Sequence, residues 1–240
     1  MPYFKNEKFV FKSINSVLKQ TYKNFEFIII YDDHDKNTYK KIQNFALKDK
    51  RIKLLKNKKN LGAGLSRNKA INISRGKFIA FIDSDDIWVK SKLYFQLNFM
   101  EKKKIFASHT SYKIIDEKGK FISNRVARNL NYNDLIKSCD IGLSTVMLNK
   151  KILKKKQLFP NLKTKEDYTL WLKIAKKNVI FYGIDKQYVY WRNTEDSLSK
   201  NIFQKLMDSI RVYHKYEKFS LINSLFKTIV LSINYLMKNK

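Results

Sequence analysis

The sequence is poor in cysteine, proline and glycine, and each scarcity excludes a class of protein. The 240 residues include 1 cysteine, 2 prolines and 6 glycines. The lone Cys139 excludes an internal disulfide framework and fits a reducing compartment. So few glycines and prolines leave little room for a low-complexity linker, and we expect a chain that folds mainly as one large unit.

Long apolar runs are also missing. The sequence has no stretch of about 18 uncharged apolar residues, the length that spans a bilayer. The first residues, Met1 to Asn6, lack the apolar core of a secretory signal. We therefore expect a cytosolic or peripheral protein. The hydrophobic residues that are present make up 44% of the chain, which is enough to bury a core.

Acidic residues are scarce relative to basic ones. The chain has 50 Lys and Arg against 21 Asp and Glu, a formal net charge of +29. The excess is spread along the sequence and does not form a basic tail. A polyanionic partner is expected, and the charge alone leaves open nucleic acid, an anionic lipid surface or a phosphorylated substrate.

Strand patterns alternate with helical patterns along the chain. Strands are predicted at residues 25–31, 52–55, 78–82, 106–115, 121–123, 144–148, 179–182 and 188–191. Helical spacing is predicted at residues 7–22, 38–47, 61–76 and 93–100, after Glu166-Asp167, and from 203 onward. This alternation predicts an α/β fold built around a parallel sheet.

An acidic cluster, Asp83 to Asp86, directly follows the predicted strand 78–82. Its three neighbouring carboxylates repel one another unless a cation or a basic group compensates them. Carboxylate oxygens suit Mg²⁺ or Mn²⁺, ions that leave coordination positions for water and substrate phosphates. The alternative is that Asp85 or Asp86 caps the next helix, although capping needs only one carboxylate.

Two further acidic pairs lie at comparable points of the chain. Asp32 and Asp33 end the strand 25–31, at the sheet edge where ligands enter open α/β folds, and could accept hydrogen bonds from a base or ribose. A turn or cap would also explain them. Glu166 and Asp167 begin a helix, where favourable interaction with the helix dipole is the simpler interpretation. A catalytic role requires one of that pair to face the site as a base.

Other nucleotide and metal motifs are not matched. The segment Gly62-Ala63-Gly64 lacks the third glycine of a dinucleotide-binding fingerprint, because Arg67 stands there, and no P-loop lysine follows. The three histidines, His34, His109 and His214, lack the paired spacing of a zinc site. We interpret them as structural or surface residues.

The carboxyl-terminal segment from Phe203 onward has amphipathic helical spacing. Its apolar positions, which include Phe219, Ile222 and Phe226, share one face, and polar positions such as Ser224 and Thr228 lie largely opposite. Two interpretations stay open: a helix packed on the core, or a basic amphipathic helix lying in a membrane interface.

Six segments in chain order resemble family 2 glycosyltransferases. They are Pro2 to Phe9, Ser16 to Tyr22, Asp32-Asp33, Asn60 to Asn68, Asp83-Ser84-Asp85-Asp86, and Glu166-Asp167 with Trp171. The resemblance covers roughly residues 2–200. It implies a GT-A fold, a nucleotide-sugar-binding mixed sheet flanked by helices, in residues 1–200, with a basic amphipathic helical segment at 201–240. The resemblance is to members that build bacterial surface polysaccharide.

The resemblance also implies an activity and its partners. The chain is expected to transfer a sugar, with inversion, from a nucleotide-diphosphate sugar, commonly a UDP-sugar, with Mn²⁺ or Mg²⁺ as cofactor. A glycan or lipid-linked molecule is the expected acceptor and an anionic membrane surface a possible partner. The expected location is cytoplasmic and peripheral, on the cytoplasmic face of the inner membrane.

Matching positions imply roles for six residues. Phe4 stands where an aromatic residue contacts the nucleobase. Asp33 matches the acid that bonds the base, and Arg67 a basic residue near it. Asp83 matches the residue beside the ribose and metal. Asp85 is the expected metal ligand and Asp167 the catalytic base that deprotonates the acceptor hydroxyl.

Three departures from the family pattern stand out. An apolar strand normally precedes the position of Pro2, and here the sequence starts at Met1, so we expect an inner strand to be missing and either a misplaced start or an impaired protein. The loop His34 to Thr38 is short and lacks the usual Gly and Ser. No histidine occurs between Trp191 and Glu195 to help hold the metal, and Arg192 could meet the diphosphate instead.

Two other functions compete with this interpretation. A nucleic-acid-binding protein would explain the charge of +29. With Asp35 counted beside Asp32 and Asp33, however, 8 of the 21 acidic residues fall in the three clusters, where a polyanion meets repulsion, so no nucleic-acid partner is expected. A non-catalytic or truncated relative of the transferases would explain the missing first strand.

Overall fold

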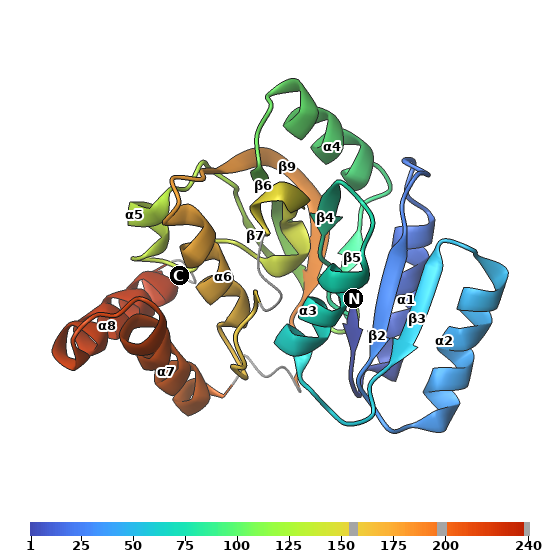
Figure 1. The fold of residues 1–240 in the computed structure, drawn as a ribbon, viewed down its shortest axis with the longest axis horizontal. Helices are drawn as coiled ribbons and strands as arrows, with labels where there is room; N and C mark the ends of the chain where they lie inside the picture. The colour runs from blue at the N-terminus through green and yellow to red at the C-terminus, as the bar shows by residue number, and fades with distance from the viewer. Residues whose placement is uncertain (154–157, 196–200, 238–240) are drawn as a thin grey trace.

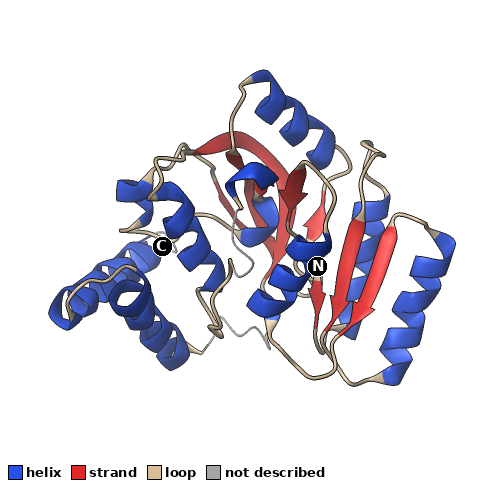
Figure 2. Ribbon diagram, in the orientation of Figure 1, coloured by secondary structure: helices blue, strands red, loops and turns tan. Residues whose placement is uncertain are grey.

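The computed structural model describes residues 1–153, 158–195 and 201–237. In the first hundred residues, strands and helices alternate in the order β1 (Pro2–Tyr3), α1 (Glu7–Leu18), β2 (Phe27–Tyr31), α2 (Lys36–Lys48), β3 (Ile52–Lys56), α3 (Ala63–Ile73), β4 (Phe78–Ala80), β5 (Ile87–Trp88) and α4 (Lys92–Lys102). The α/β prediction is confirmed, and Figures 1 and 2 show helices on both sides of the strands.

The rest of the chain builds the second half of the molecule. Its elements are β6 (Ala107–Ile115), β7 (Phe121–Arg125), α5 (Tyr132–Leu135), η1 (Leu143–Thr145), β8 (Met147–Asn149), η2 (Lys150–Ile152), α6 (Glu166–Ala175), β9 (Phe181–Arg192), α7 (Ile202–Arg211), the π-helical turn η4 (Val212–Tyr216) and α8 (Leu221–Met237). The predicted boundary between residues 200 and 201 touches residues 196–200, which lie outside the described part.

The first sheet is parallel and has the order β1-β2-β3. Every residue of β2 is buried, as expected for an apolar strand covered on both faces. Its partner β1 is short, and its pairing covers only Ile30 and Tyr31 of β2. The carboxyl ends of β1 and β2 therefore lie together, immediately before Phe4 and Asp32.

The second sheet is mixed, with the order β4-β8-β6-β9-β5 and with β7 paired to β6. Two details differ from the sequence predictions. The predicted strands 179–182 and 188–191 are one continuous strand, β9, whose pairing with β6 shifts register near Ser111. Ile87-Trp88 forms β5, and α4 begins at Lys92 with Ser91 at its N-cap, so the capping role for Asp85 or Asp86 was wrong.

The carboxyl-terminal helices both pack on the core and expose an apolar face. Val212, Tyr213 and Leu231 join the core cluster around Trp171, and α7 and α8 lie beside α6 (Figure 1). Within α8, however, the buried residues are Ser224, Thr228 and Leu231. The predicted polar face thus points inward, and the hydroxyls of Ser224 and Thr228 donate to the backbone carbonyls four residues earlier.

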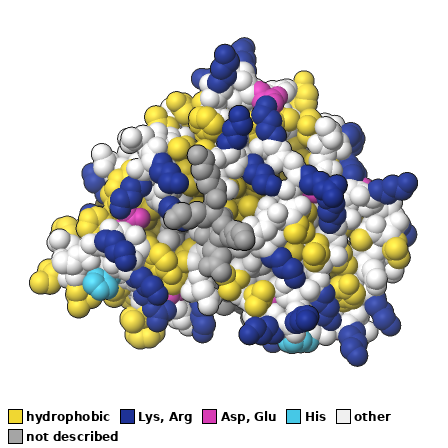
Figure 3. Space-filling model, in the orientation of Figure 1, with side chains coloured by type: hydrophobic (Ala, Val, Ile, Leu, Met, Phe, Trp, Pro, Cys, Tyr) yellow, Lys and Arg dark blue, Asp and Glu magenta, His cyan; other side chains and the backbone are white. Residues whose placement is uncertain are grey.

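The outer surface of α7 and α8 is correspondingly hydrophobic. The side chains that are more than about one-third exposed include Ile202, Phe203, Leu206, Met207, Leu221, Ile222, Leu225, Phe226, Ile229, Ile233, Leu236 and Met237. Figure 3 shows hydrophobic side chains among lysines and arginines on this part of the visible face, with basic groups spread over the rest. None of the helices in the described residues combines the length and apolarity needed to cross a membrane.

Candidate active site

Phe4 and Asp33 belong to the neighbouring segments that follow β1 and β2. The backbone N–H of Lys5 donates to Asp33 Oδ2 at 2.9 Å, and the N–H of His34 donates to Oδ1 at 2.6 Å. Asp33 is buried, while the neighbouring Phe4 ring is 46% exposed. An exposed aromatic ring and a fixed carboxylate at the same sheet edge are suited to a flat, hydrogen-bonding ligand such as a nucleobase.

Asp32, the residue before Asp33, has a structural role. Its Oδ1 accepts from Asn57 Nδ2 at 2.7 Å and from the Leu61 N–H at 2.9 Å, and its Oδ2 accepts from the Gly62 N–H at 2.8 Å. Gly62 has a φ of 81°, in the region that favours glycine, and is the N-cap of α3. Asp32 therefore fixes the loop that leads into the helix carrying Arg67.

Arg67 projects from α3 and joins two of the acidic clusters. Its Nη2 donates to Asp83 Oδ1 at 2.7 Å, and its Nη1 donates to Glu166 Oε1 at 2.6 Å. The side chain of Arg67 is 7% exposed. Burial works against its charge, but the ion pairs with Asp83 and Glu166 outweigh burial and raise the pKa of the guanidinium. The acids after β4 and those at the start of α6 are thereby brought to one place.

The loop after β4 is held by contacts from distant segments. The Asp83 N–H donates to Ser144 Oγ at 3.0 Å, Asn6 Nδ2 donates to Ser84 Oγ at 3.0 Å, and Ser13 Oγ donates to the Ser84 carbonyl at 2.9 Å. No sequence pattern indicates a role for Ser144 or Asn6. Isolated polar residues such as these carry no spacing signal, so only the fold reveals them.

Asp85 and Asp86 occupy different environments in this loop. Asp86 is fully buried, its Oδ1 accepts from the Arg192 N–H at 2.9 Å, and its Oδ2 has no hydrogen-bond partner among the described residues. Burial, then the charges of Asp85 and Asp83, raise the Asp86 pKa well above its usual range. Asp85 is partly exposed at the residue level, and burial followed by the charge of Asp83 raises its pKa to about 7.

Arg192 holds the acidic loop through contacts with its backbone. Its Nε donates to the Asp85 carbonyl at 3.1 Å, and its Nη1 donates to the carbonyls of Asp116 and Glu117 at 2.9 and 3.1 Å. Its guanidinium carbon lies 4.6 Å from the centroid of the Phe9 ring. Arg192 is 3% exposed. Its Nε and Nη1 donate to backbone carbonyls, and the suggestion that it meets a diphosphate stays a prediction.

Asp167 lies in the first turn of α6, next to the ion pair of Glu166. Its Oδ1 accepts from the Tyr168 N–H at 2.7 Å. Burial is the main cause that raises the Asp167 pKa, opposed by the charge of Arg67 and assisted by that of Asp83. The pKa of Glu166 is likewise raised, to about 7, mainly by burial. Raised carboxyl pKa values in a charged cluster are typical of acid–base sites.

The carboxylates fit a divalent cation whose coordination is completed by a bound ligand. Within residues 1–153, 158–195 and 201–237, no group of three or more His, Cys, Asp or Glu side chains forms a complete metal cage. Asp83 and Asp85 are close enough for their charges to interact, and Arg67 binds one Asp83 oxygen. Mg²⁺ is usually held by one or two carboxylates together with substrate phosphates. Two carboxylates that repel each other therefore match such an ion. Asp83 already bonds Arg67 through one oxygen, whereas no such ion pair among the described residues holds the Asp85 carboxylate.

Comparison with known proteins shows the family of the chain. The model of the family described as Glycosyl transferase family 2 matches residues 1–161. WfgD of Escherichia coli, a UDP-Glc:alpha-D-GlcNAc-diphosphoundecaprenol beta-1,3-glucosyltransferase, is 41% identical over 211 residues, which are 86% of this chain and 80% of WfgD.

Solved structures share the fold at low sequence identity. TarS 1–349 of S. aureus in complex with UDP-GlcNAc has a TM-score of 0.74 at 20% identity, covering 95% of this chain and 70% of that chain. The mannosyltransferase PcManGT of Pyrobaculum calidifontis, in complex with GDP-Man and Mn²⁺, has a TM-score of 0.67 at 12% identity, covering 95% and 67%.

The fold is the GT-A fold of glycosyltransferases. The chain belongs to glycosyl transferase family 2. The resemblance drawn from its motifs and the predicted fold class are both confirmed.

Proposed function

We propose that the chain is an inverting, metal-dependent transferase that moves a sugar from a UDP-sugar to a lipid-linked glycan in the synthesis of cell-surface polysaccharide. One observation carries the proposal. Arg67 bonds Asp83 and Glu166 at once, so acids at the end of β4 and at the start of α6 converge on one site. This convergence supports a site in which the proposed donor-binding and proton-accepting groups are neighbours.

In this proposal the donor is held by the first half of the chain. The base stacks on Phe4 and bonds Asp33, with Arg67 providing positive charge nearby and Asp83 lying beside the ribose. Asp85 and Asp83 hold Mn²⁺ or Mg²⁺, and a bound ion would neutralise charge that develops on the diphosphate. The solved relative PcManGT contains Mn²⁺ with its nucleotide sugar, which supports an ion in this class of fold.

Asp167 is the proposed catalytic base. Its carboxylate takes the proton of an acceptor hydroxyl, the hydroxyl oxygen forms a bond to the anomeric carbon, and the bond from that carbon to the diphosphate oxygen breaks. The nucleoside diphosphate leaves with the bonding electrons, and attack from the opposite side inverts the anomeric centre. Glu166 is less suited to this role, because Arg67 already occupies its Oε1 at 2.6 Å.

The proposed donor and acceptor classes rest on the relatives. The name of WfgD gives UDP-Glc as donor and a diphosphoundecaprenol-linked sugar as acceptor, and TarS was solved with UDP-GlcNAc. We extend only the chemical classes to this chain, a UDP-sugar and a diphosphate-linked lipid.

Residues 201–240 are proposed to attach the enzyme to the cytoplasmic face of the inner membrane, where a lipid-linked acceptor would be presented. The outward apolar face of α8 supports this, because Ile222 is 80% and Phe226 is 64% exposed while Ser224 is buried. Anionic lipids attract nearby lysines by about 1 kcal/mol each. Apolar insertion and charge attraction would act together.

The transferase proposal is tested with a panel of nucleotide sugars. Purified protein is incubated with UDP-Glc, UDP-GlcNAc, UDP-Gal or GDP-Man, with Mn²⁺ or Mg²⁺, and release of free nucleotide is measured with and without a diphosphoundecaprenol-linked sugar. We expect release from a UDP-sugar that is ion-dependent and accelerated by the lipid. No release from any donor with either ion would favour the non-catalytic alternative.

Membrane attachment is tested separately by sedimentation with anionic vesicles. Replacing Ile222, Phe226 and Ile229 together by Ser should reduce the bound fraction several-fold, because these side chains carry the outward apolar face. The matched control replaces Phe121, Ile122 and Val126, which are also exposed but lie on and just after β7. Equal loss in both triple variants would contradict the proposal.

A further inference from the structure

Asp208, on α7, carries a carboxylate that is completely buried. Its side chain is 0% exposed. Burying a charged group costs free energy unless hydrogen bonds and opposite charge compensate it. Gln204 Nε2 donates to Asp208 Oδ2 at 2.9 Å, and Arg211 Nη1 donates to Oδ1 at 3.0 Å, so two donors belong to the same helix. Further donors come from a distant segment of the chain.

Thr164 provides those further donors. Its backbone N–H and its Oγ1 both donate to Asp208 Oδ2 at 3.0 Å, across 44 residues of sequence. Thr164 is 8% exposed, so water has little access to these bonds. Thr164 precedes the proposed base, Asp167, by three residues. Asp208 therefore holds the segment that leads into the base.

Lys165 connects Thr164 to α6 with a left-handed backbone. Its φ is 65°, in the region that favours glycine. A lysine in this conformation costs free energy and persists only where the surrounding structure holds it. Asp208 holds Thr164 on one side, and the N–H and Oγ1 of Thr169 donate to the Lys165 carbonyl at 3.0 and 2.8 Å on the other. The turn that begins α6 is thus fixed on both sides of Lys165.

The start of α6 is anchored to two other helices. Arg67 of α3 holds Glu166, and Asp208 of α7, which lies beside α6 in Figure 1, holds Thr164. The two anchored residues flank Lys165 and come directly before Asp167. The direction in which α6 presents its first acids is therefore set from α3 and from α7.

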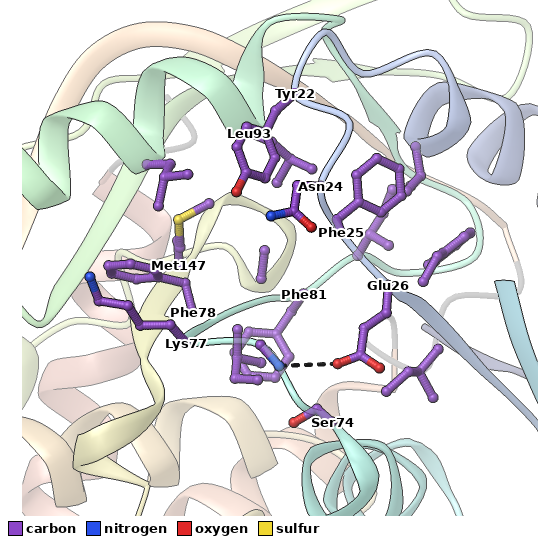
Figure 4. A pocket seen from close by; sticks show the side chains of 18 of the residues that line it. Tyr22, Asn24, Phe25, Glu26, Ser74, Lys77, Phe78, Phe81, Leu93 and Met147 are labelled. Carbon is purple, nitrogen blue, oxygen red and sulfur yellow. Dashed lines mark hydrogen bonds between the residues drawn. The ribbon is translucent and has the colours of Figure 1, made fainter. Parts of the chain in front are cut away.

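The two anchors differ in their surroundings. Arg67 borders a cavity of about 780 Å³ between β2 and β4. Figure 4 shows the lining of this cavity, with Phe25 and Phe78 on opposite sides. Its lining does not include Thr164 or Asp208. Close-packed groups resist displacement better than groups beside open space, so we expect the α7 anchor to determine the position of α6.

We propose that Asp208 is a positioning residue for the transfer reaction, which acts by holding Thr164 and thereby fixing the Asp167 carboxylate at the start of α6. The inference rests on the proposed function, in which Asp167 takes the acceptor proton. A base must lie within hydrogen-bond reach of that proton, and a misplacement of about 1 Å can cost about 10²-fold in rate. Helix α7 thus links the segment that we propose to attach to the membrane with the base.

Three variants of the full chain test the proposal. Asp208→Ala removes both oxygens and should lower kcat by about tenfold or more, with the Kd of the nucleotide sugar unchanged. Asp208→Asn keeps an oxygen that can accept from Thr164 and should recover most of the lost rate. Glu217→Ala is the matched control. It removes another buried acid of the C-terminal helices, one that bonds Tyr132 and Lys176, and should leave kcat near that of the parent.

Single-turnover kinetics give the rate of transfer, and calorimetric titration gives the Kd of the donor. An equal rate loss in Asp208→Ala and Glu217→Ala would show a general effect of lower stability and would overturn the proposal. A rate loss in Asp208→Ala that is explained by weaker donor binding would do the same. An active parent whose kcat is unchanged in Asp208→Ala refutes the inference alone, whereas a parent that turns over no donor refutes the proposed function.

Amide exchange tests the same arrangement without activity. The Tyr168 N–H donates to Asp167 Oδ1 at 2.7 Å, so its exchange reports on the position of that carboxylate. Asp208→Ala should speed exchange at Thr164 and Tyr168 by about tenfold or more, and Glu217→Ala should not. Unchanged exchange at Tyr168 in Asp208→Ala overturns the proposal, whether or not the parent is active.

A milder pair of variants applies if Asp208→Ala fails to fold. Thr164→Val keeps the shape of the side chain and removes one bond to Asp208, whereas Ser209→Ala removes a hydroxyl that donates to the Lys205 carbonyl within α7. Thr164→Val should speed exchange at Tyr168 by about threefold or more, and Ser209→Ala should leave it unchanged. Equal exchange rates in these two variants would also overturn the proposal.

Discussion

Arg67 Nη1 lies 2.6 Å from Glu166 Oε1, which joins α3 to α6 across 99 residues of sequence. Both side chains are almost fully buried, at 7% and 11% exposed. Removing one partner of a buried pair leaves an uncompensated charge, and such losses are large. The pair is therefore a structural joint of the site as well as a source of charge within it.

The first prediction concerns that joint. Arg67→Met keeps the length of the side chain and removes its charge, and we expect the free energy of unfolding to fall by about 3–5 kcal/mol. Urea denaturation measures it. The matched control is Lys41→Met, which breaks an exposed pair with Glu7 and should cost less than about 1 kcal/mol. Equal effects of the two changes would show that the Arg67 pair is not buried in solution.

The second prediction concerns Asp85 and the cation. Burial and the charge of Asp83 raise the Asp85 pKa to about 7 in the folded chain. The folded chain thus favours the protonated form of Asp85. The stability that Asp85 contributes is fully present below about pH 4, where the carboxyl is protonated in both states, and is lost as pH rises toward 7. The metal-free protein should be less stable at pH 8 than at pH 5.5 from this group, and Mn²⁺ should raise the Tm more at pH 8.

Thermal unfolding of Asp85→Asn checks that prediction. The variant should have a higher Tm than the parent at pH 8 without metal, and Mn²⁺ should raise it much less. Glu101→Gln, at an exposed ion pair with Lys77, is the control and should leave the Mn²⁺ effect unchanged. A full Mn²⁺ response in Asp85→Asn would remove this residue from the ion site.

The third prediction concerns the proposed base. Burial raises the Asp167 pKa, and only the ionised carboxylate can accept a proton, so kcat should fall on the acidic side of the pH profile. Asp167→Asn should lower kcat by about 10²-fold or more. The Kd of the nucleotide sugar should change little, and the acidic limb should disappear from the residual rate.

Glu166→Gln is the companion variant for Asp167. Its amide oxygen can still accept from Arg67, so kcat should fall much less than in Asp167→Asn. Single-turnover kinetics across pH 5 to 9 distinguish the two. A larger kcat loss in Glu166→Gln, with donor binding intact, would exchange the roles of these neighbours.

The fourth prediction concerns the nucleobase. Phe4→Ala should weaken UDP binding by about 1–3 kcal/mol, the usual effect of removing an aromatic ring that stacks on a base. The Tm should hardly change, because the ring is 46% exposed. Calorimetric titration with UDP measures the Kd. Tyr94→Ala removes an equally exposed ring from α4 and should leave the Kd unaltered.

The sequence predicted the fold well, and it also predicted which acidic residues follow strands, because both depend on local patterns. Apolar runs such as Phe27 to Tyr31 identify buried strands, and acids directly after a strand must lie at its carboxyl end. Asp83 and Asp85 were placed correctly in this way. Their assigned chemistry stays a prediction until it is measured.

The remainder depends on contacts between distant segments. No local pattern separates Asp32, which holds the loop before α3, from Asp33, which accepts from the Lys5 N–H. The position of Arg192 beside the acidic loop follows from the pairing of β9 with β5 and β6, which a single sequence does not give. Helical periodicity located the apolar face of α8, but tertiary packing decided that this face points outward.

The contacts of Asp32 have a consequence for the speed of nucleotide capture. Its carboxylate already immobilises Asn57, Leu61 and Gly62 in the free chain. The loop before α3 therefore loses its conformational entropy during folding. Ordering this loop does not reduce the affinity for a nucleotide that binds later. A nucleotide that binds at this edge should therefore meet a preformed loop, and its association rate should be governed by diffusion and charge.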